Sequence, residues 1–136
     1  DEDVFKQSRI DSFLDANLVF SREFRVYVLE IKSLNEILYK RMQSAYLFYL
    51  DGIEKALSFD KFISGNKITI ADISFVCDTA QFLRERDNKK TIEEQGYEII
   101  SKDFEKDYPL SLKHLKDLSK LDEFNEIMSN YLDKIL

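Results

Sequence analysis

The chain of 136 residues contains only three Gly and one Pro. All-β proteins need many tight turns that favour Gly, so this scarcity argues against that class. The three glycines, Gly52, Gly65 and Gly96, cannot be arranged into either of the Gly-rich phosphate-binding motifs, GxGxxG or GxxxxGK[ST]. The sequence therefore contains neither the usual dinucleotide-binding fingerprint nor a P-loop.

Cysteine and histidine are each present once, as Cys77 and His114. A single Cys excludes a disulfide framework within the chain, and the pair is too small to supply a zinc site built from those ligands. The two residues could form a catalytic pair. The simpler interpretation is that Cys77 is a small core side chain on an apolar helix and that His114 is exposed or hydrogen-bonded.

The charge balance and the hydrophobic runs limit the partners. Asp and Glu outnumber Lys and Arg by 26 to 20, for a net charge of −6, which argues against non-specific nucleic-acid binding. The longest apolar runs, such as residues 45–50, are too short to span a bilayer. No secretory signal opens the chain and a lone Cys suits a reducing compartment, so we expect a cytoplasmic protein without membrane contact.

Apolar residues make up 44% of the chain and aromatic residues 13%, which is a globular composition. The length suits one domain covering residues 1–136, and we see no internal boundary. The chain begins at Asp1, without an initiator Met and inside a helical pattern. We therefore expect it to be a piece of a longer protein.

Helical spacing of apolar residues dominates the first half of the sequence. A first apolar stripe runs from Ile10 to Leu18, and the alternating segment 26–31 is interpreted as a connection or a frayed helix end. Ser33 and Glu36 have the spacing of a capping box. The long helix that it would start is expected to end near residue 57.

Thr69 and Asp72 form a second predicted capping box, with Ile68 and Ile73 placed as its hydrophobic staple. The helix that follows is apolar on nearly all sides, which is typical of a helix at the centre of a bundle. Burial leaves the first amides of such a helix without water, so its N-terminus needs a firm cap. We therefore assign Thr69 and Asp72 a structural, capping role.

The second half is less regular. Residues 84–107 are interpreted as a charged connection with a short helix over 97–104. Pro109 suits the first turn of another helix, and residues 124–135 carry the spacing of a last one. The sequence therefore predicts an all-α bundle of about five helices.

Three segments, in this order, resemble the C-terminal helical domain of the glutathione transferase superfamily. Residues 8–15 (SRIDSFLD) are similar to the "ARVDEYL" opening of the fourth helix of that family, and residues 61–74 (KFISGNKITIADIS) to its "FLxGxxxTxAD" segment. Residues 107–110 (DYPL) are similar to the "FP/YP" start of the helix after it. Theta-like and bacterial members resemble the chain most.

This resemblance implies a right-handed bundle of about five helices that follows a thioredoxin-like domain. In the family that first domain binds glutathione, through a cis-Pro and a Ser, Tyr or Cys that activates the thiol, and this sequence does not contain it. By the resemblance the intact protein would be a detoxifying transferase with glutathione as cofactor. This chain would contribute the site for a hydrophobic small-molecule electrophile and part of a homodimer surface, and would not catalyse conjugation alone.

The resemblance also suggests substrate-binding residues on the first helix. Arg9 would meet an anionic group of glutathione, and Asp11 would approach glutathione or a partner subunit. Ser12 and Asn17 would touch the second substrate, and Phe20 would be a wall of its pocket. The alternative is an ordinary solvated helix face with a local Asp11–Arg9 pairing and with Phe20 in the core.

Two other functions stay open. Glutathione transferase-like helical domains also hold partners together without chemistry, in elongation-factor subunits and in aminoacyl-tRNA synthetase complexes. An exposed apolar patch of several hundred Å² without a cofactor pocket would favour that interaction module. An unrelated helical bundle is the remaining alternative.

Overall fold

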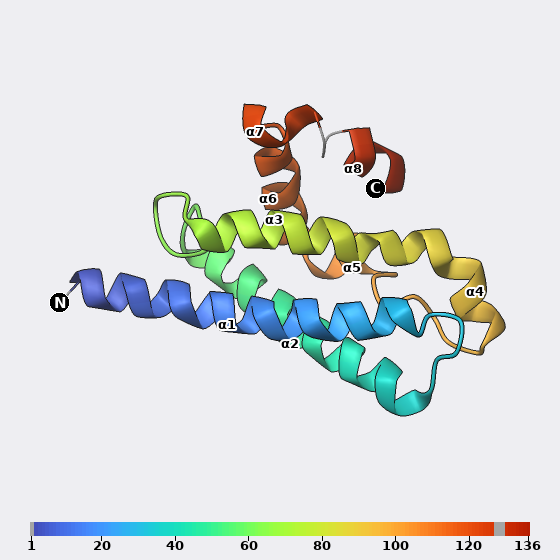
Figure 1. Cartoon of the computed structure of the whole chain (residues 1–136). Helices are drawn as coiled ribbons and strands as arrows, with labels where there is room; N and C mark the ends of the chain where they lie inside the picture. The colour runs from blue at the N-terminus through green and yellow to red at the C-terminus, as the bar shows by residue number, and fades with distance from the viewer. Residues whose placement is uncertain (1, 127–129) are drawn as a thin grey trace.

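The computed structural model describes residues 2–126 and 130–136. These residues form helices joined by turns, with no β-strand among them, so the all-α prediction is confirmed. Figure 1 shows two long helices crossing each other, a third beside the first, and a fourth rising from this layer.

The two long helices are α1, Glu2–Leu29, and α2, Glu36–Phe59. They form a hairpin and make the most extensive helix contact of the described chain (Figure 1). Of the two interpretations of residues 26–31, the helix end holds for their first part, because α1 continues through Leu29 and turns follow it. The alternation arises because Tyr27 is fully buried between two half-exposed valines.

The predicted capping box at Ser33 is also wrong. Asn35 is the N-cap of α2, and its Oδ1 accepts a hydrogen bond from the Leu38 amide at 2.9 Å. Asn caps a helix as well as Ser does, and here it starts the helix two residues later. Glu36 is therefore the first helical residue and forms an i,i+4 ion pair with Lys40 at 3.2 Å.

The third helix, α3, spans Ile70–Phe82 and packs against α1 on one side and α6 on the other (Figure 1). The capping box predicted for it is present. The Thr69 hydroxyl accepts from the Ala71 amide at 3.2 Å, and the Asp72 carboxylate accepts from the Thr69 amide at 2.8 Å. Ile70 is 56% and Ile73 43% exposed, so α3 has a solvent-facing side although Phe75, Val76 and Phe82 are fully buried.

Residues 83–107 form short elements: the 3-10 helix η1, Leu83–Asn88; α4, Lys89–Glu94; and α5, Phe104–Asp107. The short helix predicted over 97–104 is wrong in position, because residues 97–103 are extended or turns and α5 begins at Phe104. The Phe104 ring is fully buried, and its burial fixes the point where the chain turns back toward the bundle.

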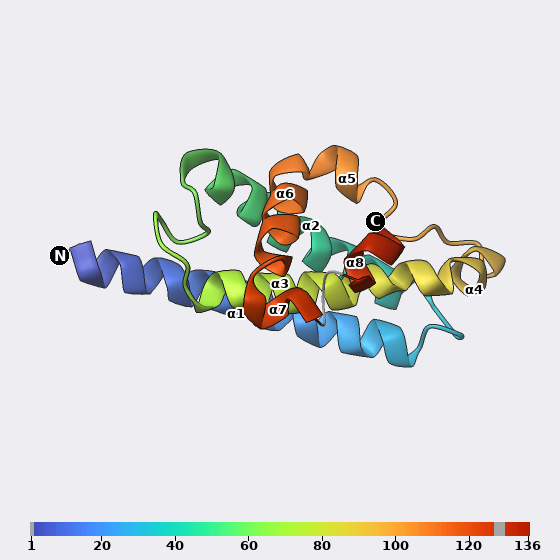
Figure 2. The same ribbon diagram turned by 90° about the horizontal axis from the view of Figure 1, so that it is seen from above.

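The chain ends with α6, Pro109–Ser119; α7, Asp122–Phe124; and α8, Asn130–Ile135. Pro109 occupies the first turn of α6, as predicted. Figure 2 shows α6 standing across α3, with α7 and α8 following it back over the bundle. Residues 127–129 of the predicted last helix lie outside the described residues.

An aromatic cluster holds α1, α2 and α3 together. The Phe20 ring of α1 stacks on Tyr49 of α2 with ring centroids 4.9 Å apart, and lies 5.2 Å from Phe82 of α3. Tyr46 stacks on the same Phe82 ring at 5.0 Å. Such pairs add to the free energy gained by burying the apolar area of the rings.

Candidate functional site

A groove of about 600 Å³ lies between α1 and α2, and one of the predicted substrate-binding residues lines it. Ser12, predicted to touch a substrate, lines the groove. The other lining residues are Phe13, Asp15, Ala16, Val19, Phe48, Tyr49, Asp51, Gly52 and Lys55. The walls are therefore mainly apolar, with charged side chains of both signs among them.

Phe48 is the most exposed aromatic side chain of this groove. It is 72% exposed, and Val19 across the groove is 41% exposed. Gly52 follows Phe48 by one helical turn, and a Cβ at Gly52 would meet the Phe13 ring at 3.9 Å, an ordinary contact. The groove thus carries a protruding ring directly beside a position without a side chain.

Arg9 and Asp11 already have partners within the chain. The Arg9 guanidinium pairs with the Asp60 carboxylate at 3.1 Å, which ties α1 to the segment after α2. The Asp11 carboxylate accepts a hydrogen bond from the side-chain amide (Nε2) of Gln7 at 2.9 Å. The local Asp11–Arg9 pairing considered from sequence is thus replaced by these two contacts.

Asn17 and Phe20 face the interior. The Asn17 side-chain amide donates to the Tyr49 hydroxyl at 3.0 Å and to the Ser74 carbonyl at 3.4 Å, so it links α1 to both neighbouring helices. Phe20 is 1% exposed. The sequence held a signal for this burial, because both residues continue the apolar stripe through Phe13 at helical spacing.

Burial raises the pKa of two neighbouring groups on α3. Desolvation raises the pKa of the Asp78 carboxyl above its ordinary value, and hydrogen bonding from Asn17 and the charge of Arg25 oppose this only in part. Desolvation, followed by the Asp78 charge, also raises the pKa of the Cys77 thiol. A raised thiol pKa lowers the thiolate fraction at neutral pH, which makes Cys77 a poor nucleophile.

Asp72 does more than cap α3. Its carboxylate is fully buried, and its Oδ1 accepts from the Ile63 amide at 3.0 Å and contacts Nε2 of His114 at 2.8 Å. Because a carboxylate only accepts, Nε2 carries the proton of the latter bond. One side chain therefore joins the segment before α3, the N-terminus of α3, and α6. The sequence pattern predicted only the cap.

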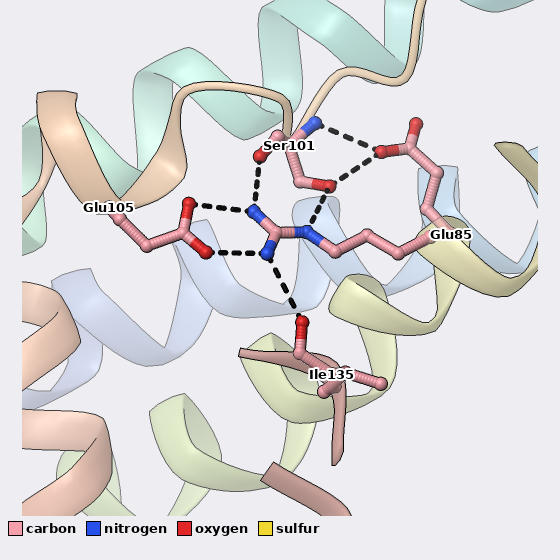
Figure 3. A network of polar contacts seen from close by, with 5 residues as sticks. Glu85, Ser101, Glu105 and Ile135 are labelled. Carbon is pink, nitrogen blue, oxygen red and sulfur yellow. Dashed lines mark hydrogen bonds and ion pairs between the residues drawn. The ribbon is translucent and has the colours of Figure 1, made fainter. Parts of the chain in front are cut away.

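Two adjacent residues of η1, Glu85 and Arg86, organise the segment 99–105 (Figure 3). The buried Glu85 carboxylate accepts from the Ile100 amide at 2.8 Å and from the Ser101 amide and hydroxyl at 2.9 Å each. It also accepts from the Tyr27 hydroxyl at 2.7 Å, and desolvation with the nearby Glu85 charge raises the pKa of that phenol. The carboxylate thus receives four hydrogen bonds.

The Arg86 side chain joins η1 to two other parts of the chain, the segment 99–105 and helix α8, through partners labelled in Figure 3. Its guanidinium makes a bidentate pair with the Glu105 carboxylate, and it also donates to the Ser101 carbonyl at 2.7 Å and the Ile135 carbonyl at 3.3 Å. The Arg86 hydrogen bond holds the pKa of the Glu105 carboxyl below its ordinary value. Sequence reasoning missed this network, because nothing local separates these charges from the solvated ones around them.

A similar arrangement fixes the start of α6. The Glu54 carboxylate of α2 accepts from the Leu110 amide at 2.8 Å, and from the Ser111 amide and hydroxyl at 2.8 and 2.7 Å. Helix N-termini leave such amides without partners, and a carboxylate there also interacts favourably with the helix dipole. This cap comes from another helix and could not be read from the local sequence.

Within residues 2–126 and 130–136, no group of three or more His, Cys, Asp and Glu side chains could hold a metal ion. No helix among those residues is long and apolar enough to cross a membrane. Comparisons of the chain with protein-family models, with curated proteins and with solved structures gave no match.

Proposed function

We propose that this chain is the helical domain of a glutathione transferase-like protein and that its α1–α2 groove is the surface through which two copies associate. The resemblance of three ordered segments supports the first part. The middle segment is the most specific of the three, and its capping box carries the structural roles just described at Thr69 and Asp72. The second part rests on the groove.

The observation that carries the proposal is an exposed aromatic ring, Phe48, beside a position without a side chain, Gly52, in one groove. A two-fold interface must fit a copy of itself, so each copy must present both a projection and a recess. Phe48 provides the projection, and the space over Gly52 beside Phe13 provides the recess. A Phe48 ring inserted into the partner's recess would remove from water an aromatic side chain that is 72% exposed.

The charges of the groove support a second copy as well. Asp15 and Lys55 both line it, and neither is in an ion pair within the described part of the chain. A two-fold axis through the groove would let Lys55 of each copy approach Asp15 of the other. The net charge of −6 per copy opposes association, and two Lys55–Asp15 pairs would offset part of this repulsion.

Of the five predicted substrate-binding residues, Ser12 is the one that lines the groove, so the proposed electrophile site rests on that residue. Asn17 and Phe20 are enclosed by the three helices, and Arg9 and Asp11 are engaged by other side chains. The described residues therefore do not assemble a glutathione site by themselves. The buried positions of Asn17 and Phe20 favour the second candidate, a non-catalytic interaction module of the same type.

Sedimentation of matched variants tests the proposal. Phe48→Asp places a charge in the groove, whereas Phe59→Asp places the same charge at the end of α2, where Phe59 is 76% exposed and outside the groove. We expect the wild type and Phe59→Asp to self-associate in the micromolar range and Phe48→Asp to stay monomeric. A monomeric wild type at several hundred micromolar, or equal association of the two variants, would contradict the proposal.

A binding experiment separates the transferase from the interaction module. The probe is 1-chloro-2,4-dinitrobenzene, titrated into the ¹⁵N-labelled chain, with chemical-shift changes followed in the two-dimensional amide spectrum. Saturable changes at residues 12–19 would support the electrophile site. Their absence, with self-association retained, would leave the non-catalytic module.

A further inference from the structure

A second concave site lies at the C-terminal end of α2, between the segment 60–68 and α6. Its volume is about 470 Å³, within the range of small-molecule pockets. It shares no lining residue with the α1–α2 groove. The apolar part of its wall consists of Leu57, Phe62, Ile68, Leu110, Leu118 and Leu121.

Several of these apolar side chains remain partly in water. Ile68 is 44% exposed, and Leu110 and Leu121 are each 39% exposed. They come from the segment before α3, from the start of α6 and from the turn after it, and they meet around one hollow. A hydrocarbon chain lying in this hollow would cover apolar surface that the fold leaves exposed.

Most charged side chains of the pocket wall already have an oppositely charged partner, and one cation does not. Asp60 is paired with Arg9 at 3.1 Å, and Asp117 is paired with Lys113 at 2.6 Å. Lys61 is in no ion pair within the described part of the chain; its ammonium lies 5.4 Å from the centre of the Phe62 ring. The charge left without an opposite partner at the pocket is therefore that of Lys61.

His114 adds a second polar group to this wall. Its Nε2 is held by the buried Asp72 carboxylate at 2.8 Å, which fixes the ring between Phe62 and Phe75. Since Nε2 carries the proton of that bond, Nδ1 is the ring atom that still has hydrogen-bonding capacity. No hydrogen bond to Nδ1 is made within the described residues, so the Asp72–His114 pair leaves one polar atom unused beside an apolar hollow.

We infer that this pocket binds a small molecule with a hydrocarbon body and one carboxylate, the body against the leucines of α6 and the carboxylate against Lys61. The apolar wall sets the first requirement and the unpaired ammonium sets the second. A neutral ligand would forgo the ion pair, and a cationic one would be repelled by Lys61. The inference is independent of the association of two copies, because the two sites use different residues.

The test uses decanoate as the probe, with decanol as a neutral ligand of the same chain length and decylamine as a cationic one. Binding is measured by amide chemical shifts of the ¹⁵N-labelled chain at concentrations below micelle formation. We expect saturable shifts at residues 61–68 and 110–121, and about fivefold tighter binding of decanoate than of decanol, the scale of one exposed ion pair. Decylamine should bind more weakly than both.

Matched variants locate the charge. Lys61→Gln should remove the preference for decanoate over decanol, and Lys120→Gln, an exposed lysine just after α6 and outside the pocket, should retain it. Both are surface substitutions and should leave the far-ultraviolet circular dichroism spectrum unchanged. Shifts confined to other residues, equal binding of decanoate and decanol, or a preference unaffected by Lys61→Gln would each overturn the inference.

Discussion

Replacement of Asp72 by Ala is the substitution whose effect on stability follows most directly from the structure. The carboxylate accepts from the Ile63 amide at 3.0 Å and from the Thr69 amide at 2.8 Å, and it holds Nε2 of His114 at 2.8 Å. All three donors lose their partner together in the variant. Ile63 is fully buried and His114 is 8% exposed, so water does not replace the lost acceptor at either residue.

The size of the effect follows from these donors. A buried donor left unsatisfied costs about 1–3 kcal/mol, and loss of a helix cap costs about 1 kcal/mol. Two buried donors and one cap together predict a loss of about 3–7 kcal/mol in the free energy of unfolding. For a domain of this length, each kcal/mol corresponds to about 4 °C in Tm, so the midpoint should fall by roughly 12–28 °C.

Urea unfolding followed by far-ultraviolet circular dichroism measures this loss, with two variants for comparison. Thr69→Ala removes only the hydroxyl that accepts from Ala71, and should cost about 1 kcal/mol. Asp117→Ala breaks an exposed ion pair with Lys113, and should cost less than about 1 kcal/mol. An Asp72→Ala variant no less stable than Thr69→Ala would refute the assignment of Asp72 as the link between three segments.

Three further predictions follow from other buried groups. Arg86→Lys keeps the charge but loses the planar fork that binds Glu105 and the Ser101 carbonyl, and should lower the free energy of unfolding by about 1–2 kcal/mol; unchanged urea midpoints would contradict this. The folded-state pKa of Asp78 is raised, so the stability that this carboxyl contributes is present below its unfolded pKa, near 3.8, and is lost as pH rises through the folded value. The free energy of unfolding of Asp78→Asn should therefore increase relative to that of the wild type as pH rises from 3 to 7. A difference that shrinks with rising pH would contradict this prediction. The raised pKa of Cys77 predicts that iodoacetamide alkylates it more slowly in the folded chain than in urea at pH 7, as mass spectrometry would measure; equal rates would contradict this prediction.

The features that the sequence predicted correctly are local ones. Thr69 and Asp72 stand three residues apart, so their spacing alone predicts the capping box that the structure contains. The same kind of signal failed at Ser33, because Asn35 competes for the N-cap and starts α2 later. Where two good capping residues lie within one turn, the local pattern does not decide between them.

The features that the sequence did not predict are contacts between distant segments. Glu85 binds Tyr27 from 58 positions away, and Glu54 caps α6 from 57 positions away at Ser111. Nothing around Glu85 or Glu54 distinguishes them from the exposed acidic residues nearby, because a carboxylate becomes buried only where the fold supplies several donors to it. For Asn17 the helical spacing from Phe13 indicates the buried position, but its hydrogen-bond partners on α2 and α3 could not be predicted from the sequence.

The central proposal is that a second copy occupies the α1–α2 groove, and the most direct measurement is a mixed-sample NMR experiment. One batch carries a spin label at Ser44→Cys, an exposed position one helical turn before Phe48 and outside the groove lining, in a Cys77→Ser background. The other batch is ¹⁵N-labelled wild type without a spin label. We predict selective broadening of the amide signals of residues 12–19 and 48–52 in the ¹⁵N-labelled copies, and none of these effects with the label at Lys120→Cys. Absence of intermolecular broadening at those residues, or the same broadening from both label positions, would contradict the proposal.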